Sequence, residues 1–545
     1  MNEKMEFASR RSVVFGRRGM VAASQPLAVA AGLEVLALGG NAADAAVAVA
    51  AALNVTEPTS TGIGGDCFAL YFDADTGQVT ALNGSGRAPG ALNLARLQRE
   101  GFSSLPAYHP YTITVPGACA GWCDLLARHG RLPLGRVLAP AIRLAEEGVP
   151  VAPVAAYFWD QAARGQLRTA PGGHEMTLDG RAPRAGEIFR NPGLAATLKM
   201  VAEGGKEAFY EGPIAEAMAS VVQKAGGCLT TADLAAHVST WERPIHTLYR
   251  DARIWECPPN GQGLTALIAL NILEGFDLSD LPPLSAERLH LEIEALRLAF
   301  ADTRWFVADP ATNPAPLELL LSKEYAAQRR RLIDPQKACL DKQRGVPIAS
   351  SDTVYLSVID GAGNACSFIN SNYMGFGTGI VPPGYGFTLQ NRGHNFSLDP
   401  KHPNALRPGK RPYHTIIPAL ATRVGPDNGP DVLYGSFGVM GGFMQPQGHM
   451  QVLTALLDDR LDAQTALDRP RFCIEDGTSG GLLAMEQGIP TETLAELSRR
   501  GHQVRLVSGY ERALFGRGQI ILRDPDSGVL TGGSDPRADG CAMTY

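Results

Sequence analysis

The sequence SSDTVYLSVIDGAGNACSFIN, residues 350–370, indicates a β-hairpin. β-Branched and aromatic residues are frequent in 353–359 and 365–370, and the glycine-containing segment 360–364 between them is a strong turn signal. We therefore predict two antiparallel strands. The polar stretch 337–352 before them lacks periodicity, so it is predicted to be a surface loop, a place where a chain can be cut.

Thr353 stands where this loop meets the first predicted strand. If the chain is cut before Thr353, the new α-amine lies within reach of the residue's own hydroxyl. An amine with a pKa near about 8 is a suitable base at neutral pH, so one residue would supply both nucleophile and base. Taken alone, the stretch also fits, and more simply, an ordinary threonine at a strand edge.

A second feature is a glycine-rich connection between a strand and a helix. We predict a strand at 431–435 and a helix at 447–457 with Pro446 in its first turn, and the sequence GVMGG, residues 438–442, lies between them. Backbone N–H groups freed by Gly441 and Gly442 at the positive end of a helix can hold a developing oxyanion. A tight strand–helix turn is the plainer interpretation.

Helical and strand-like patterns alternate along the rest of the chain, which predicts an α/β or α+β fold. Gly39-Gly40 is a helix stop and Asn41 a helix N-cap. The other predicted helices are 25–38, 42–53, 134–147, 214–225 and 286–301, and the other predicted strands are 67–72, 386–390 and 518–523.

Composition excludes several classes of protein. A chain of 545 residues with 45% hydrophobic residues is long and apolar enough to bury a core. With 49 basic and 55 acidic residues, it offers no general positive charge for nucleic acid. The N-terminus has no apolar run typical of a secretory signal, and the apolar stretch 42–55 is too short and too polar to span a membrane. We expect a cytoplasmic protein that does not bind membranes.

Known short motifs for metal binding or catalysis give little information about the function of this sequence. The nine cysteines include no CxxC pair, so we expect free thiols, with neither a disulfide framework nor a metal site, and no cofactor. One GxSxG match, residues 477–481, lacks the following helix that a nucleophile elbow needs, and a glycine-rich turn is the preferred interpretation.

Taken together, these residues resemble the γ-glutamyltransferase family of N-terminal-nucleophile hydrolases. The matching segments are GGNAADA (39–45), TGIGGD (61–66), VPG (115–117), APAIRLA (139–145), AFYEG (208–212), DT (352–353), FGTG (376–379), KRP (410–412) and DPR (535–537). Their number and order make the resemblance specific over nearly the whole chain. It implies a four-layer αββα sandwich. It also implies a precursor that cuts itself into a large fragment, 1–352, and a small fragment, 353–545, which stay together as one domain.

The resemblance also implies roles for single residues. Known members cleave γ-glutamyl amides such as glutathione through a γ-glutamyl-enzyme ester, and water or an amino acid then takes the acyl group. Carried over to this sequence, the cut falls between Asp352 and Thr353, and Thr353 is the nucleophile. Ser371 matches a second hydroxyl residue that hydrogen-bonds near the nucleophile, and Gly441 and Gly442 match the oxyanion donors.

The positions that bind glutamate in the family differ here. The arginine that holds the α-carboxylate is matched by Ser85, with Arg87 two residues later, and the acidic residue that receives the α-amine is matched by Asn395. These departures resemble a branch that includes cephalosporin acylase-like and oxamate amidohydrolase-like enzymes. The candidate substrate-binding residues are Arg87, Tyr373, Arg392, Asn395, His414 and Thr415.

Three functions therefore stay open. The first is cleavage of γ-glutamyl amides of the glutathione class. The second is an acylase or small-amide hydrolase that acts on acidic acyl groups without an α-amine. The third is a non-catalytic protein that kept the fold, against which the retained Asp352-Thr353, Ser371 and glycine pair argue. The implied partners are a small-molecule substrate and the two fragments of one precursor, assembled as a precursor homodimer or a heterotetramer.

Overall fold

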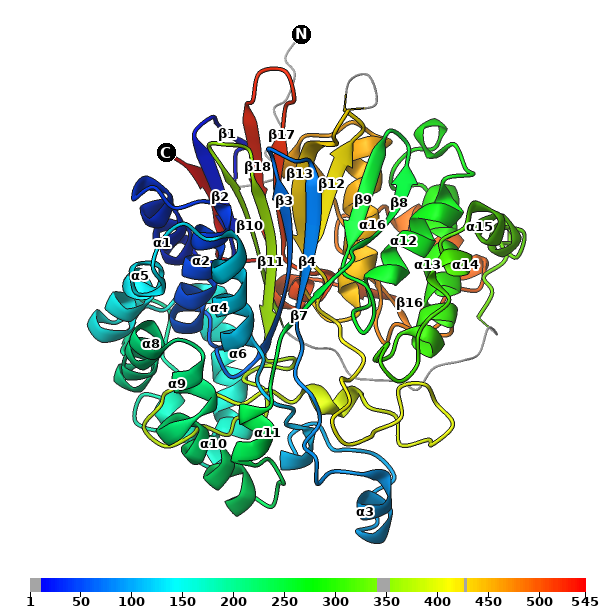
Figure 1. Cartoon of the computed structure of the whole chain (residues 1–545). Coiled ribbons are helices and arrows are strands. Elements are labelled where there is room, and N and C mark those ends of the chain that lie inside the picture. The colour runs from blue at the N-terminus through cyan, green and yellow to red at the C-terminus, as the bar shows by residue number, and fades with distance from the viewer. Residues whose placement is uncertain (1–10, 341–352, 426–428) are drawn as a thin grey trace.

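The computed structural model describes residues 11–340, 353–425 and 429–545, and its elements form four layers, helices–sheet–sheet–helices (Figure 1). The first sheet has seven strands in the order β19 (Cys541–Thr544), β2 (Gly19–Ala23), β10 (Val354–Asp360), β11 (Ala365–Ser371), β3 (Asp66–Asp73), β4 (Gln78–Gly84) and β7 (Thr240–Glu242). The second has the order β1 (Val14–Gly16), β18 (Leu530–Ser534), β17 (Gly518–Arg523), β13 (Val432–Val439), β12 (Ala419–Arg423), β9 (Ala252–Glu256) and β8 (Ile245–Tyr249). Strands β10 and β11 contact β13, so the sheets pack face to face. The predicted αββα sandwich is confirmed.

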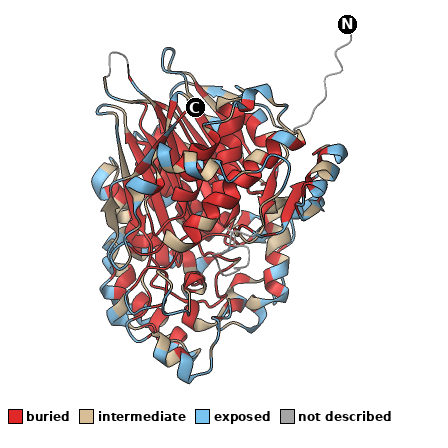
Figure 2. Ribbon diagram, turned by 90° about the vertical axis from the view of Figure 1, so that its right-hand side faces the viewer, coloured by how far each residue is buried: buried red, intermediate tan, exposed pale blue. Residues whose placement is uncertain are grey.

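The hairpin predicted at 353–370 lies at the centre of the first sheet. Val354 pairs with Asn370 and Ile359 with Ala365, and the carboxylate of Asp360 accepts hydrogen bonds from the turn. Every residue of β10 and β11 is buried, because one face of the sheet meets helices and the other meets the second sheet (Figure 2).

The first sheet combines strands from both sides of residue 353. Strands β2, β3, β4 and β7 precede that residue, whereas β10, β11 and β19 follow it. On its two edges the hairpin pairs antiparallel with β2 and β3, and β2 pairs on its other edge with β19. Main-chain hydrogen bonds therefore join the two predicted fragments along the full hairpin.

Helices α1 (Pro26–Ala37), α2 (Ala42–Thr56), α4 (Ala118–His129), α5 (Leu134–Glu147) and α8 (Pro192–Gly204) form the outer layer on the side of the first sheet (Figure 1). Helix α2 contacts α1, α5, β10 and β11, and all its residues are buried. Its alanines allow this close approach. Asn41 caps it as predicted, in a reciprocal capping box with Asp44.

Helices α12 (Gly263–Leu273), α13 (Ala286–Phe306) and α16 (Met444–Leu457) form the layer on the side of the second sheet (Figure 1). Helix α12 contacts α13, α16, β8 and β9, and α16 also contacts β13. The helix predicted at 286–301 is α13, which continues to Phe306, and the helix predicted at 214–225 is α10 (Gly212–Lys224). Of the described residues, no helix is both long and apolar enough to cross a membrane.

Of two further sequence predictions, the structure contradicts one and confirms the other. The strand predicted at 386–390 is wrong: this segment belongs to no sheet, and Leu389 and Gln390 donate instead to the loop carbonyls of Ile380 and Gly64. The motif at 477–481 is confirmed as a turn, since it connects β14 (Phe472–Ile474) and β15 (Leu483–Glu486). All nine cysteines are free thiols.

Candidate active site

Thr353 lies immediately before β10 and is completely buried. Its Oγ1 is 3.1 Å from Oγ of Ser371, the last residue of β11, because the hairpin register places these two residues opposite each other. The Nε2 of Gln445, in the first turn of α16, donates to Thr353 Oγ1 from 3.4 Å. The hydroxyl therefore lies between the hairpin end and the beginning of a helix. The other half of the predicted cleavage site, Asp352, lies outside the described residues.

Ser371 connects Thr353 to a buried arginine. Its Oγ accepts hydrogen bonds from the Tyr373 N–H at 2.9 Å and from Nη2 of Arg392 at 3.2 Å. Nη1 of Arg392 donates to Oγ1 of Thr415 at 2.7 Å, and the guanidinium lies 4.4 Å from the centroid of the Tyr373 ring. The Tyr373 hydroxyl donates in turn to Oδ1 of Asn395 at 2.6 Å. Five predicted site residues thus form one connected cluster with Thr353.

Arg392 is a fully buried cation. Within the described ranges it has no carboxylate at ion-pair distance, and its Nε has no hydrogen-bond partner. Burial lowers the pKa of Arg392 to about 10, an effect that the negative charge of Asp66 opposes, so the side chain is still cationic at neutral pH. A buried charge with unused donors is costly unless an anion compensates it.

Asp66, at the start of β3, is hydrogen-bonded through both oxygens. His414 lies 3.0 Å from its Oδ2, and Oδ1 accepts from the N–H groups of Gly86 and Gly117 and from Nε2 of Gln390. Burial favours a raised pKa for Asp66, but the hydrogen bond and charge interactions with His414 hold it below its ordinary value. Burial, followed by the charge of Arg392, lowers the pKa of His414 to about 3, so His414 is neutral and donates to Asp66. These four hydrogen bonds therefore use both oxygens of the Asp66 carboxylate.

Gly441 and Gly442 connect β13 to α16 with positive φ angles of 121° and 60°. Neither N–H donates a hydrogen bond to any described residue, whereas the carbonyl of Gly442 accepts one from Nε2 of Gln262 at 2.8 Å. Gly441 lines a cleft of about 1040 Å³, together with Met374, Tyr157 and Tyr510. The two N–H groups are therefore available at the helix end that also carries Gln445 to Thr353.

One predicted substrate-binding residue lies apart from this cluster. Arg87 is half-buried, and its Nη1 donates to the carbonyl of Val238 at 3.3 Å. The sequence analysis did not identify Gln445, because the predicted helix began at residue 447, whereas α16 begins at Met444 and includes Gln445 in its first turn. It also did not predict that His414 would pair with Asp66, because 348 residues separate the two in the chain.

The comparisons with known proteins agree with this geometry. The family profile described as Gamma-glutamyltranspeptidase matches residues 28–545, and the chain belongs to this family of hydrolases and transpeptidases. It is 39% identical to the glutathione hydrolase-like YwrD proenzyme of Bacillus subtilis, with 97% of this chain and 99% of the relative covered. It is 36% identical to the oxamate amidohydrolase proenzyme of Klebsiella pneumoniae, with 97% and 98% covered.

Among solved structures, the cephalosporin acylase from Bacillus halodurans matches with a TM-score of 0.91. It is 46% identical, and the match covers 100% of this chain and 99% of the acylase. The fold, the family and the enzyme class that the sequence indicated are thus confirmed. The similar proteins carry names with three different substrates, so the family by itself does not define the acyl group.

Proposed function

We propose that this enzyme is a self-processing amidase whose substrates carry a small acidic acyl group without an α-amine. The observation that supports this proposal is the buried guanidinium of Arg392, which has no carboxylate at ion-pair distance among the described residues and donates to the same Ser371 that contacts Thr353. A carboxylate on the acyl chain would supply the missing negative charge. Tyr373, Asn395 and Thr415 around Arg392 would complete the polar surroundings of the acyl group.

The reaction begins with the precursor. A cut between Asp352 and Thr353 gives the fragments 1–352 and 353–545 and leaves a free α-amine on Thr353. This amine takes the proton from Oγ1, and the oxygen attacks the carbonyl carbon of the substrate amide. The N–H groups of Gly441 and Gly442 hold the resulting oxyanion.

Collapse of this tetrahedral intermediate breaks the C–N bond. The α-ammonium of Thr353 returns the proton to the leaving amine, and the acyl group remains as an ester on Oγ1. Water, or an amino acid as acceptor, attacks the ester in a second round and regenerates the threonine. The cleft beside Gly441, with the stacked rings of Tyr157 and Tyr510, would hold the leaving amine.

Cleavage of γ-glutamyl amides is the second candidate, favoured by the 39% identity to a glutathione hydrolase-like proenzyme. A γ-glutamyl group also carries an ammonium, which must be paired when it leaves water. Asn395 offers this ammonium only a dipole, the oxygens of Asp66 already accept four hydrogen bonds, and Arg392 repels a second cation. The surroundings of Thr353 therefore favour an acyl group without the amine.

Matched anilides test the proposal directly. Purified, processed enzyme is assayed with glutaryl, γ-glutamyl and butyryl anilides, which share a leaving group and differ only in the acyl chain. The proposal expects kcat/KM to be highest for the glutaryl compound and lowest for the uncharged butyryl compound. Preference for the γ-glutamyl anilide would support the second candidate function. If processed enzyme cleaved none of the three anilides, both candidate functions would be excluded.

A further inference from the structure

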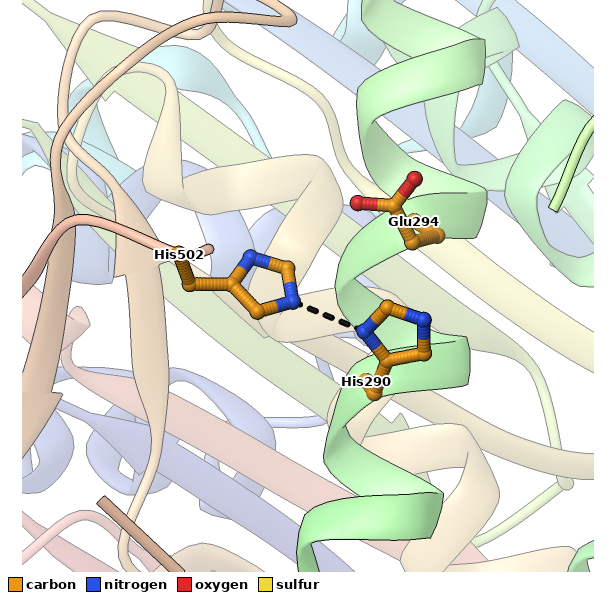
Figure 3. Close-up of side chains that lie close together, drawn as sticks. All are labelled: His290, Glu294 and His502. Carbon is orange, nitrogen blue, oxygen red and sulfur yellow. Dashed lines mark hydrogen bonds between the residues drawn. The ribbon is translucent and has the colours of Figure 1, made fainter. Parts of the chain in front are cut away.

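Three buried side chains lie close together at helix α13: His290 and Glu294 of that helix, and His502 (Figure 3). One ligand atom of each lies within 4.8 Å of the others. His290 and Glu294 are one turn apart on α13, so they share one face of that helix. His502 follows α18 (Thr491–Arg499), which packs against α13.

The hydrogen bonds around His290 orient the imidazole. Its Nε2 is 2.8 Å from the carbonyl oxygen of Asp334, which can only accept, so the Nε2 carries the proton. Its Nδ1 therefore presents a lone pair, directed toward Nε2 of His502 at 2.8 Å. A backbone carbonyl that fixes one nitrogen while the other is free to coordinate is the usual support of a metal-ligating histidine.

The carboxylate of Glu294 is oriented in a similar way. Its Oε2 accepts the N–H of Cys339 at 3.1 Å, and Nε of Arg297 is 3.7 Å from its Oε1. The terminal nitrogens of Arg297 are directed instead at the carbonyls of Ser479 and Gly481. In the hydrogen bond between the two rings, Nε2 of His502 carries the proton that Nδ1 of His290 accepts. Metal binding moves this proton to Nδ1 of His502, which has no hydrogen-bond partner among the described residues, so that both facing nitrogens offer lone pairs.

We propose that His290, Glu294 and His502 bind one divalent transition-metal ion of the zinc class, with water as the fourth ligand. Two imidazoles and a carboxylate are a ligand set that Zn²⁺ accepts. Bonds of about 2.0–2.1 Å in a tetrahedral site place the two nitrogens roughly 3.3 Å apart, so they need to separate by roughly 0.5 Å from their hydrogen-bonded distance. The sequence did not indicate this site, because its ligands form no known short metal motif and His502 lies 212 residues after His290.

The site would connect distant parts of the chain. Its two α13 ligands precede residue 353 and His502 follows it. If the proposed cleavage occurs, the ion joins the two fragments, a consequence that rests on the proposed function, whereas metal binding itself does not.

Metal content tests the proposal. Full-length protein with a non-histidine affinity tag is equilibrated with Zn²⁺, freed of excess metal and analysed by mass spectrometry for bound zinc. We expect about one ion per chain in the unmodified protein. His502→Ala and Glu294→Gln should each lose most of it. Two controls should retain it: His174→Ala, at an exposed histidine, and His449→Asn, at a buried histidine bonded to Glu256 instead.

A second measurement uses the unmodified protein and does not depend on how the variants fold. Titration with Co²⁺ should produce the visible absorption bands of a tetrahedral site, saturating at about one equivalent, and Zn²⁺ should abolish them. Absence of bound zinc and of these bands would show that the cluster is only a histidine–histidine hydrogen bond. Unchanged metal content in folded His502→Ala would equally overturn the assignment.

Discussion

Replacement of Arg392 by Gln removes the buried charge and keeps a hydrogen-bond donor of similar reach. A hydrogen bond to a charged group contributes about 1.5–3 kcal/mol. Its loss in the transition state would lower kcat/KM for a glutaryl anilide about 10- to 150-fold, because each 1.4 kcal/mol corresponds to a factor of ten. The γ-glutamyl anilide should lose less, since its ammonium no longer faces the guanidinium. The ratio of the two efficiencies should therefore fall by about tenfold or more.

The same measurement separates two roles for this arginine, because Arg392 also donates to Ser371 Oγ. Gel electrophoresis first establishes that the variant is processed, and circular dichroism establishes that it is folded. A loss that is equal for glutaryl, γ-glutamyl and butyryl anilides would mean that Arg392 positions Ser371 and does not bind the acyl group. A hundredfold preference of the unmodified enzyme for the γ-glutamyl compound, about 2.7 kcal/mol, would also refute the reasoning.

Three further outcomes are expected. Active enzyme should run on a denaturing gel as two fragments of 352 and 193 residues. With 57.9 kDa for 545 residues, their masses are about 37 and 20 kDa. The Thr353→Ala variant should run as one intact chain, because the attacking hydroxyl is gone. Gly442→Val should lower turnover by about 10²–10³ while its circular dichroism spectrum stays native, and full activity would exclude Gly442 as an oxyanion donor. Burial lowers the pKa of His237, His414 and His449 to about 3, against about 6.5 when unfolded, so the unfolded chain binds more protons between these values. The free energy of unfolding should therefore fall as the pH drops from about 6.5 toward 3, and urea titrations at several pH values would contradict this if they gave a flat profile.

Local patterns in the sequence predicted the elements that depend on local chemistry. The cap at Asn41, the hairpin after residue 353 and α5 all follow from capping, turn and periodicity signals within a few residues. The segment 386–390 was predicted incorrectly for a related reason. Its residues suit a strand, but the backbone partners that decide the matter are loop carbonyls, including that of Gly64 more than 300 residues away.

The residues of the candidate site also fall into two groups, those that the sequence predicted and those whose contacts depend on tertiary packing. Thr353 and the glycine pair were predicted from local patterns and Ser371 from the family resemblance, and the hydroxyl contact at 3.1 Å agrees with the hairpin register. The motifs could not show that Arg392 has no carboxylate at ion-pair distance in the described part of the chain, because that depends on every chain segment packed around it. Pairing of His414 with Asp66, and separation of Arg87 from the cluster, likewise depend on tertiary packing.

If the proposed cleavage occurs, the mixing of strands from before and after residue 353 in the first sheet has a consequence for a population of cleaved molecules. A fragment could leave its companion only by breaking the hydrogen bonds of β10 with β2, of β11 with β3 and of β19 with β2. Mature molecules made in isotopically heavy and light media, once mixed, should therefore never yield hybrids under native conditions. Each small fragment would keep for life the large fragment with which it was synthesised, and a defect in either half could not be repaired by exchange.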